Sequence, residues 1–148
     1  MTNDKTPIWF ADQGSDLSAI NALHAGTACE ALGIEVTEVG ADFLRGTMPA
    51  DERTFQPFRL IHGGCNVVLA ETLGSIAANL LVDSSKYYCV GQEVNANHVR
   101  GVRQGLVTGT ARLAYQGKTS QVWEIHIEDE RGRLSCISRL TMAVVKHA

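Results

Sequence analysis

The segment from Cys65 to Val82 constrains the fold of this chain most, because it is apolar on nearly every side and so needs burial. Its small residues would let a sheet approach the helix backbone closely. A membrane span is the competing interpretation, but a central glutamate and two asparagines make insertion into a bilayer costly. We therefore predict a long buried helix wrapped by the rest of the chain, and no membrane as a partner.

The remaining segments predict an α+β domain in which one curved antiparallel β-sheet surrounds that helix. We expect one or two short helices within residues 16–32, and a hairpin with its turn at Gly40 within residues 34–48. Four further strands are expected over residues 87–99, 106–115, 120–128 and 134–146, joined as a meander by glycine-containing hairpin loops. The 148 residues suffice for one domain, with residues 1–15 as a flexible N-terminal extension.

Charge and cysteine spacing exclude several classes of function. The net charge of −3 and the pI near 5.9 give no field that would gather polyanions, so nucleic acid is not expected as a partner. The four cysteines show no C-x-x-C pair and no zinc-type spacing, so we expect reduced thiols and no metal site. The chain starts without a basic and apolar leader, which favours a cytoplasmic location.

Glu71 is the only permanently ionisable side chain between Arg59 and Asp83, and it falls midway along the predicted helix. Because burial of an unpaired carboxylate is costly, this group should take up a proton or face a partly wetted cavity. Either outcome suits a catalytic base or nucleophile. A structural ion pair with a distant arginine is the alternative.

His62, Gly63 and Gly64 stand at the start of the same helix, where unobstructed N–H groups and the helix dipole favour a developing negative charge. They can form an oxyanion hole, or simply a turn. Gly64 and Glu71 are about 10 Å apart along a helix, so one carbonyl cannot contact both in one chain. If both act on the same substrate atom, they come from two subunits across a two-fold axis, and we expect a dimer.

Two further features have both a functional and a structural interpretation. Ser75 follows Glu71 by one helical turn on the same face, where it can bond the substrate or serve as a small packing residue. The segment from Gly91 to Arg100 gives one strand face a polar character, which suits ligand binding or plain solvation. No Ser-His-Asp or Cys-His arrangement, phosphate loop or H-E-x-x-H motif is present.

Taken together, these motifs resemble those of the hotdog-fold acyl-CoA thioesterases of the PaaI-like branch. Within that branch the chain is most similar to the bacterial 1,4-dihydroxy-2-naphthoyl-CoA thioesterases and the enterobactin-pathway proofreading thioesterases, from about Leu17 to Val145. The resemblance implies a long helix wrapped by an antiparallel sheet, with dimers assembled as a homotetramer. It rests on Gln56-Pro57-Phe58, His62-Gly63-Gly64, Leu69-Ala70-Glu71-Thr72, Gly74-Ser75 and Val94-Asn95-Ala96-Asn97-His98.

The resemblance also implies roles for individual residues. Glu71 would be the catalytic carboxylate, as nucleophile or as general base. Gln56 and His62 would position the thioester, the N–H of Gly63 or Gly64 would stabilise the oxyanion, and Ser75 would assist near Glu71. The residues toward the pantetheine arm and the nucleotide would be Gly91, Asn97, His98 and Arg100.

The implied function is hydrolysis of an aromatic or medium-chain acyl-CoA, or of an acyl-carrier-protein thioester, without cofactor or metal. Arg59 departs from the pattern, because close relatives usually carry glycine after Gln-Pro-Phe, and this puts the substrate range in question. A non-catalytic acyl-CoA-binding module and a hotdog hydratase or dehydratase are the alternatives.

Overall fold

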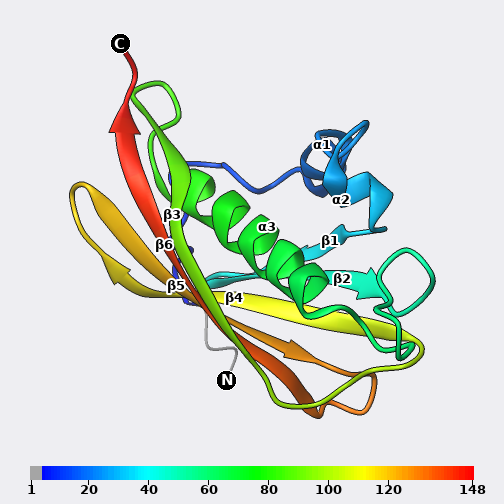
Figure 1. Ribbon diagram of the computed structural model, residues 1–148. Helices are drawn as coiled ribbons and strands as arrows, with labels where there is room; N and C mark the ends of the chain where they lie inside the picture. The colour runs from blue at the N-terminus through cyan, green and yellow to red at the C-terminus, as the bar shows by residue number, and fades with distance from the viewer. Residues whose placement is uncertain (1–4) are drawn as a thin grey trace.

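One six-stranded antiparallel sheet curves around a single long helix, α3, in the computed structural model, which describes residues 5–148 (Figure 1). The strand order is β1-β2-β4-β5-β6-β3, so β1 and β3 are the two edges. The α+β class and the wrapped helix are therefore confirmed. The elements are α1 (Leu17–Ala22), α2 (Ala28–Ala31), β1 (Glu35–Val39), β2 (Phe43–Pro49), α3 (Gly63–Leu81), β3 (Tyr87–His98), β4 (Leu106–Gln116), β5 (Ser120–Glu128) and β6 (Leu134–Lys146).

The pairing of β3 differs from the predicted four-strand meander. β4, β5 and β6 do form a meander, but β3 pairs with β6 and β4 pairs with β2. The spacer over residues 100–105 is thus a crossover rather than a hairpin loop, although Gly105 ends it with a positive φ of 80°. The prediction was wrong because the hairpin rule considers only neighbours in sequence, whereas closing the sheet around α3 puts β3 beside the last strand.

Burial of α3 is uneven around the helix. One face packs against the sheet, and Gly74 lies so close to it that a Cβ would stand 2.5 Å from Leu140 Cδ2. The opposite face, with Glu71, Thr72 and Ser75, is half-buried. By length and composition α3 could cross a membrane, yet its apolar face forms the core of this domain. The buried residues of α3 are Asn66, Leu69, Ala70, Leu73, Gly74, Ala77, Ala78 and Leu81.

The N-terminal extension is packed onto the domain. Trp9 is buried and stacks on Trp123, with ring centroids 6.3 Å apart, and its indole N–H donates to Gly40 O. Gln13 Nε2 donates to the carbonyls of Leu80 and Val82, which satisfies groups that the end of α3 leaves open. This stretch of the extension therefore has defined contacts with the domain, and its flexibility stays a prediction. Residues 1–4 of the extension lie outside the described part of the chain.

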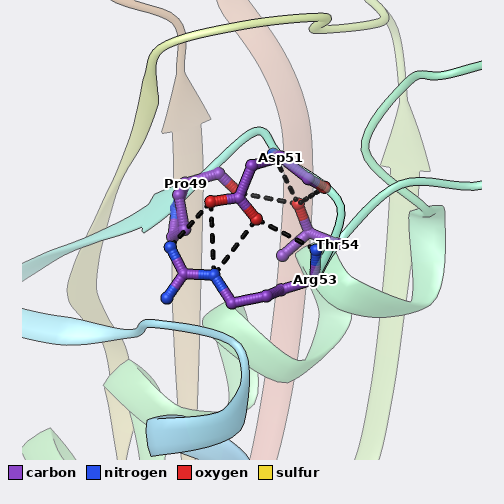
Figure 2. A network of polar contacts seen from close by, with 4 residues as sticks. All are labelled: Pro49, Asp51, Arg53 and Thr54. Carbon is purple, nitrogen blue, oxygen red and sulfur yellow. Dashed lines mark hydrogen bonds and ion pairs between the residues drawn. The ribbon is translucent and has the colours of Figure 1, made fainter.

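A polar network fixes the loop between β2 and α3 (Figure 2). Asp51 accepts from the backbone N–H and from the guanidinium of Arg53, and Thr54 Oγ1 donates to Pro49 O at 2.7 Å. The buried Thr54 then accepts the N–H of His62 at its carbonyl oxygen, 2.7 Å away. This network sets where α3 begins, and so where its first N–H groups point.

Candidate active site

His62 caps the N-terminus of α3 and binds the backbone N–H of only one of the two glycines that follow it. Its backbone is extended (φ −62°, ψ 131°), and its Nδ1 accepts the N–H of Gly64 at 2.8 Å. An accepting Nδ1 places the ring proton on Nε2 in the neutral form. The Gly64 N–H is thus occupied within the chain, which leaves Gly63 as the glycine whose N–H can face a ligand.

A cavity of about 330 Å³ opens beside this helix end, between α3 and the crossover after β3. It brings together four of the residues singled out in the sequence: Gln56, Gly63, His98 and Arg100. The imidazole of His98 lies against Gly63, where a Cβ would stand 2.7 Å from Nε2. Gln56 Oε1 accepts the N–H of Phe58, so its amide nitrogen remains as a donor.

Glu71 lies outside this cavity, eight residues further along α3, or about 12 Å by helical rise. Its carboxylate is half-buried beside the edge strand, and a Cβ on Gly91 would lie 2.3 Å from Glu71 Oε1. Glu71 makes no ion pair within residues 5–148. Within residues 5–148, Glu71 therefore lacks the arginine partner that the structural alternative required.

A β-bulge in β3 determines which of its side chains face α3. The register against β6 shifts between Gly91 and Glu93. Before the shift Gly91 faces α3, and after it Val94, Ala96 and His98 do so, because the bulge moves the alternation by one residue. Asn97 is exposed and points to the other face, so the structure does not place it with the cavity residues.

Ser75 lies on the half-buried face of α3, one turn beyond Glu71. Its hydroxyl donates weakly to Met142 Sδ at 3.7 Å, and it lines a second, largely apolar cavity of about 320 Å³ with Ile76, Leu80 and α1. The residues from α1 and the turn after it are Ile20, Leu23 and His24. Within one chain, the predicted site residues therefore form two separate groups, one at the start of α3 and one around Glu71.

The comparisons with known proteins give the family. The model of the thioesterase superfamily matches residues 58–136, which include the α3 segment and its glycines. The chain belongs to the thioesterase superfamily. It is a thioester hydrolase of the hotdog fold, as the resemblance in the sequence implied.

Curated relatives of this thioesterase cover most of its length. The 1,4-dihydroxy-2-naphthoyl-CoA hydrolase of Escherichia coli is 48% identical over 87% of this chain and 94% of its own. The proofreading thioesterase EntH of Cronobacter turicensis is 50% identical over 87% and 93%. A solved structure of a thioesterase variant from Pseudomonas aeruginosa superposes with a TM-score of 0.91 at 49% identity, covering 95% of this chain and 99% of that one.

The thiols and one asparagine complete the description of this thioesterase. All four cysteines are free, and burial raises the pKa of the thiols of Cys65, Cys89 and Cys136, which keeps them protonated at neutral pH. Residues 5–148 contain no group of three or more His, Cys, Asp or Glu side chains that could hold a metal ion. Asn66 also lines the cavity at the start of α3, and it was not among the predicted site residues. Its signal in the sequence is an amide within an apolar helix, one turn after Gly63.

Proposed function

We propose that this thioesterase hydrolyses acyl-CoA thioesters with an aromatic or medium-length acyl group, releasing the free acid and CoA. The observation that carries the proposal is Glu71, a half-buried carboxylate without an ion-pair partner in the described chain, placed on the rigid central helix. Carboxylates in such a setting serve as nucleophiles or general bases. The name of the Escherichia coli relative, an aryl-CoA hydrolase at 48% identity, supports an aromatic acyl group.

Both mechanistic routes use the same groups. In one, Glu71 attacks the thioester carbon, the C–S bond breaks, CoA leaves as the thiolate, and water then hydrolyses the acyl anhydride. In the other, Glu71 removes a proton from a water molecule that attacks directly. In either route the N–H of Gly63, at the positive end of α3, would stabilise the oxyanion. Gln56 and His62 would orient the thioester through their remaining N–H donors.

Assembly of these groups needs a second copy of the chain. β3 is a twelve-residue edge strand with exposed side chains, and such an edge is a ready site for strand pairing. If two copies of β3 pair antiparallel about an axis between Val94 and Asn95, Gly91 lies opposite the partner subunit's His98. Glu71 would then meet the N–H of the partner subunit's Gly63. We propose that each site is shared in this way, and that two such dimers form the tetramer.

The acyl group would enter the apolar cavity beside Ser75. This cavity begins one turn beyond Glu71 along α3, and its volume of about 320 Å³ suits one ring system or a medium alkyl chain. The CoA arm would leave along the partner's cavity, past His98 and Arg100. A thioester on a carrier protein offers the same pantetheine arm and is the alternative substrate in a cytoplasmic setting.

The test is thiol release from benzoyl-, hydroxybenzoyl-, dihydroxynaphthoyl-, hexanoyl- and palmitoyl-CoA by the wild type and by Glu71→Gln. We expect fast release from the aryl or hexanoyl thioesters, and a loss of at least 100-fold in kcat for the variant, because the amide can neither attack nor accept a proton. Equal circular dichroism spectra of the two proteins serve as the control for folding.

Sharing of the site is tested in the same assay by mixing subunits. Glu71→Gln and Gly63→Val are each expected to be inactive, but a mixed dimer contains one intact site. Random exchange makes half of the dimers mixed, so about a quarter of the wild-type rate should return. Absence of recovery after verified exchange would refute the shared site.

The substrate panel itself has outcomes that contradict the proposal. Thiol release that does not depend on Glu71 would refute the mechanism, and binding of CoA thioesters without release would favour a binding module. Water addition to crotonyl-CoA would indicate a hydratase.

A further inference from the structure

Asn66 lines the cavity at the start of α3 and carries a buried, unpaired acceptor. Its side chain is only 4% exposed, and its Oδ1 is one of two buried side-chain atoms in the described chain that have no hydrogen-bond partner. The residue lines the 330 Å³ cavity together with Gln56, Gly63 and His98. A buried acceptor left unpaired is destabilising, and native proteins contain few of them. A donor from a ligand in this cavity would satisfy it.

A second asparagine on the same helix shows that the fold can satisfy such a group. Asn79 Nδ2 donates to Ser75 O and Cys89 O, at 2.9 and 3.1 Å, and its Oδ1 accepts the N–H of Cys89 at 2.8 Å. Asn79 therefore ties α3 to β3 as a structural residue. Asn66 lacks these ties, although it is more deeply buried than Asn79, and it lines the cavity instead.

We infer that Asn66 positions the substrate by accepting a hydrogen bond from the amide N–H of the pantetheine arm nearest to the sulfur. This inference rests on the proposed hydrolysis of CoA thioesters. Asn66 follows Gly63 by three residues, a rise of about 4.5 Å. In a CoA thioester two methylene groups separate the sulfur from that amide nitrogen, which is a comparable length. A thioester held at the N–H of Gly63 thus brings its amide N–H to Asn66 Oδ1.

The experiment compares two small thioesters that differ only in this donor. One is S-benzoyl-N-acetylcysteamine, and the other is its ester analogue made from 2-mercaptoethyl acetate, which has no N–H. Rates are divided by the uncatalysed rates in alkali, and each compound is also measured as a competitor of benzoyl-CoA, so that slow turnover still yields an inhibition constant. We expect the wild type to prefer the amide about tenfold in kcat/KM or in inhibition constant.

The variants then assign the preference to one side chain. Asn66→Leu, of similar volume, should reduce the ratio of amide to ester to about one, whereas Asn66→Asp, which keeps an oxygen in the same place, should retain the preference. Asn79→Ala is the matched control: it should lower thermal stability, because Asn79 ties α3 to β3. Asn79 also lines the cavity proposed for the acyl group, but both compounds carry the same benzoyl group, so the ratio of amide to ester should stay unchanged. A structural role of Asn66 would change overall activity but not this ratio.

Two results would overturn the inference. One is equal kcat/KM values and equal inhibition constants of the amide and the ester with the wild type. The other is an unchanged preference for the amide in Asn66→Leu. If Asn66→Leu instead abolishes a preference for hydroxybenzoyl over benzoyl thioesters, Asn66 contacts the acyl group and not the pantetheine arm. Failure of the proposed function is distinguishable, because the wild type would then release no thiol from benzoyl-CoA itself.

Discussion

Gly91→Ala should inactivate the enzyme while leaving the fold intact. An added Cβ would stand 2.3 Å from Glu71 Oε1, about 1 Å closer than a relaxed contact between carbon and oxygen. Gly91 is exposed and its φ is not in the left-handed region, so the backbone accepts alanine. The flexible end of Glu71 moves instead. A displacement of about 1 Å in a reacting group corresponds to a loss of about 100-fold in kcat.

The assay is steady-state thiol release from benzoyl-CoA, together with thermal unfolding and sedimentation. Asn95→Ala, on the same strand but pointing away from α3, is the matched control. Asn95 Nδ2 bonds only to Glu93, and the proposed pairing of β3 about this position uses the backbone, so the variant should keep its rate. The double variant Gly91→Ala/Glu71→Gln should be no slower than Glu71→Gln alone, since both changes act on one group. A Gly91→Ala protein of normal kcat, or losses that multiply in the double variant, would refute this account of Glu71.

Two further predictions concern stability rather than turnover. Arg59 is exposed and has a φ of 59°, a left-handed conformation that favours glycine. Arg59→Gly should therefore raise the free energy of unfolding, measured by urea denaturation, by about 0.5 kcal/mol. Arg59→Ala keeps the strained backbone and should not raise it. Hydrogen bonds from the Arg133 side chain and backbone and from the Arg131 N–H lower the pKa of Asp129 to about 2. A carboxyl group whose pKa is lowered on folding stabilises the folded state above its unfolded pKa of about 4, and this stabilisation is lost as the pH falls through about 2. Asp129→Asn should therefore lower Tm at pH 6, and its Tm should converge with that of the wild type near pH 2. A difference in Tm that does not change with pH would contradict this.

Most elements could be predicted from the sequence because each carries a local signal. The strand β5 was placed without error, since its alternation and its flanking turns are clear, and the start of α3 was missed by only two residues. The position of β3 beside β6 had no such signal. Strand order is decided by which face each strand must turn to the helix, and that depends on contacts between residues far apart in the chain.

The candidate site shows the same division between local and distant information. The two glycines at the start of α3 and the half-buried position of Glu71 could be predicted from residue type and spacing, and their catalytic roles stay predictions. The orientations of Asn97 and His98 could not be predicted, because strict alternation from Gly91 would turn Asn97 toward α3. The extra residue of the bulge turns His98 toward it instead. Nor could spacing show that the N–H of Gly64 is already bound by His62.

The bulge also connects the fold to the shared site. Gly91 touches Glu71 and His98 touches Gly63, so β3 carries a contact to each part of the site at a separation of seven residues. In a strand without a bulge, residues seven apart point to opposite faces, and the two parts could not both lie on the α3 side. With the bulge, both parts lie on the α3 side. A two-fold axis perpendicular to the sheet would then bring Glu71 of one subunit beside the partner subunit's Gly63. In the proposed dimer, this single irregularity in an edge strand would make the carboxylate of one subunit and the proposed oxyanion donor of the other available to the same thioester.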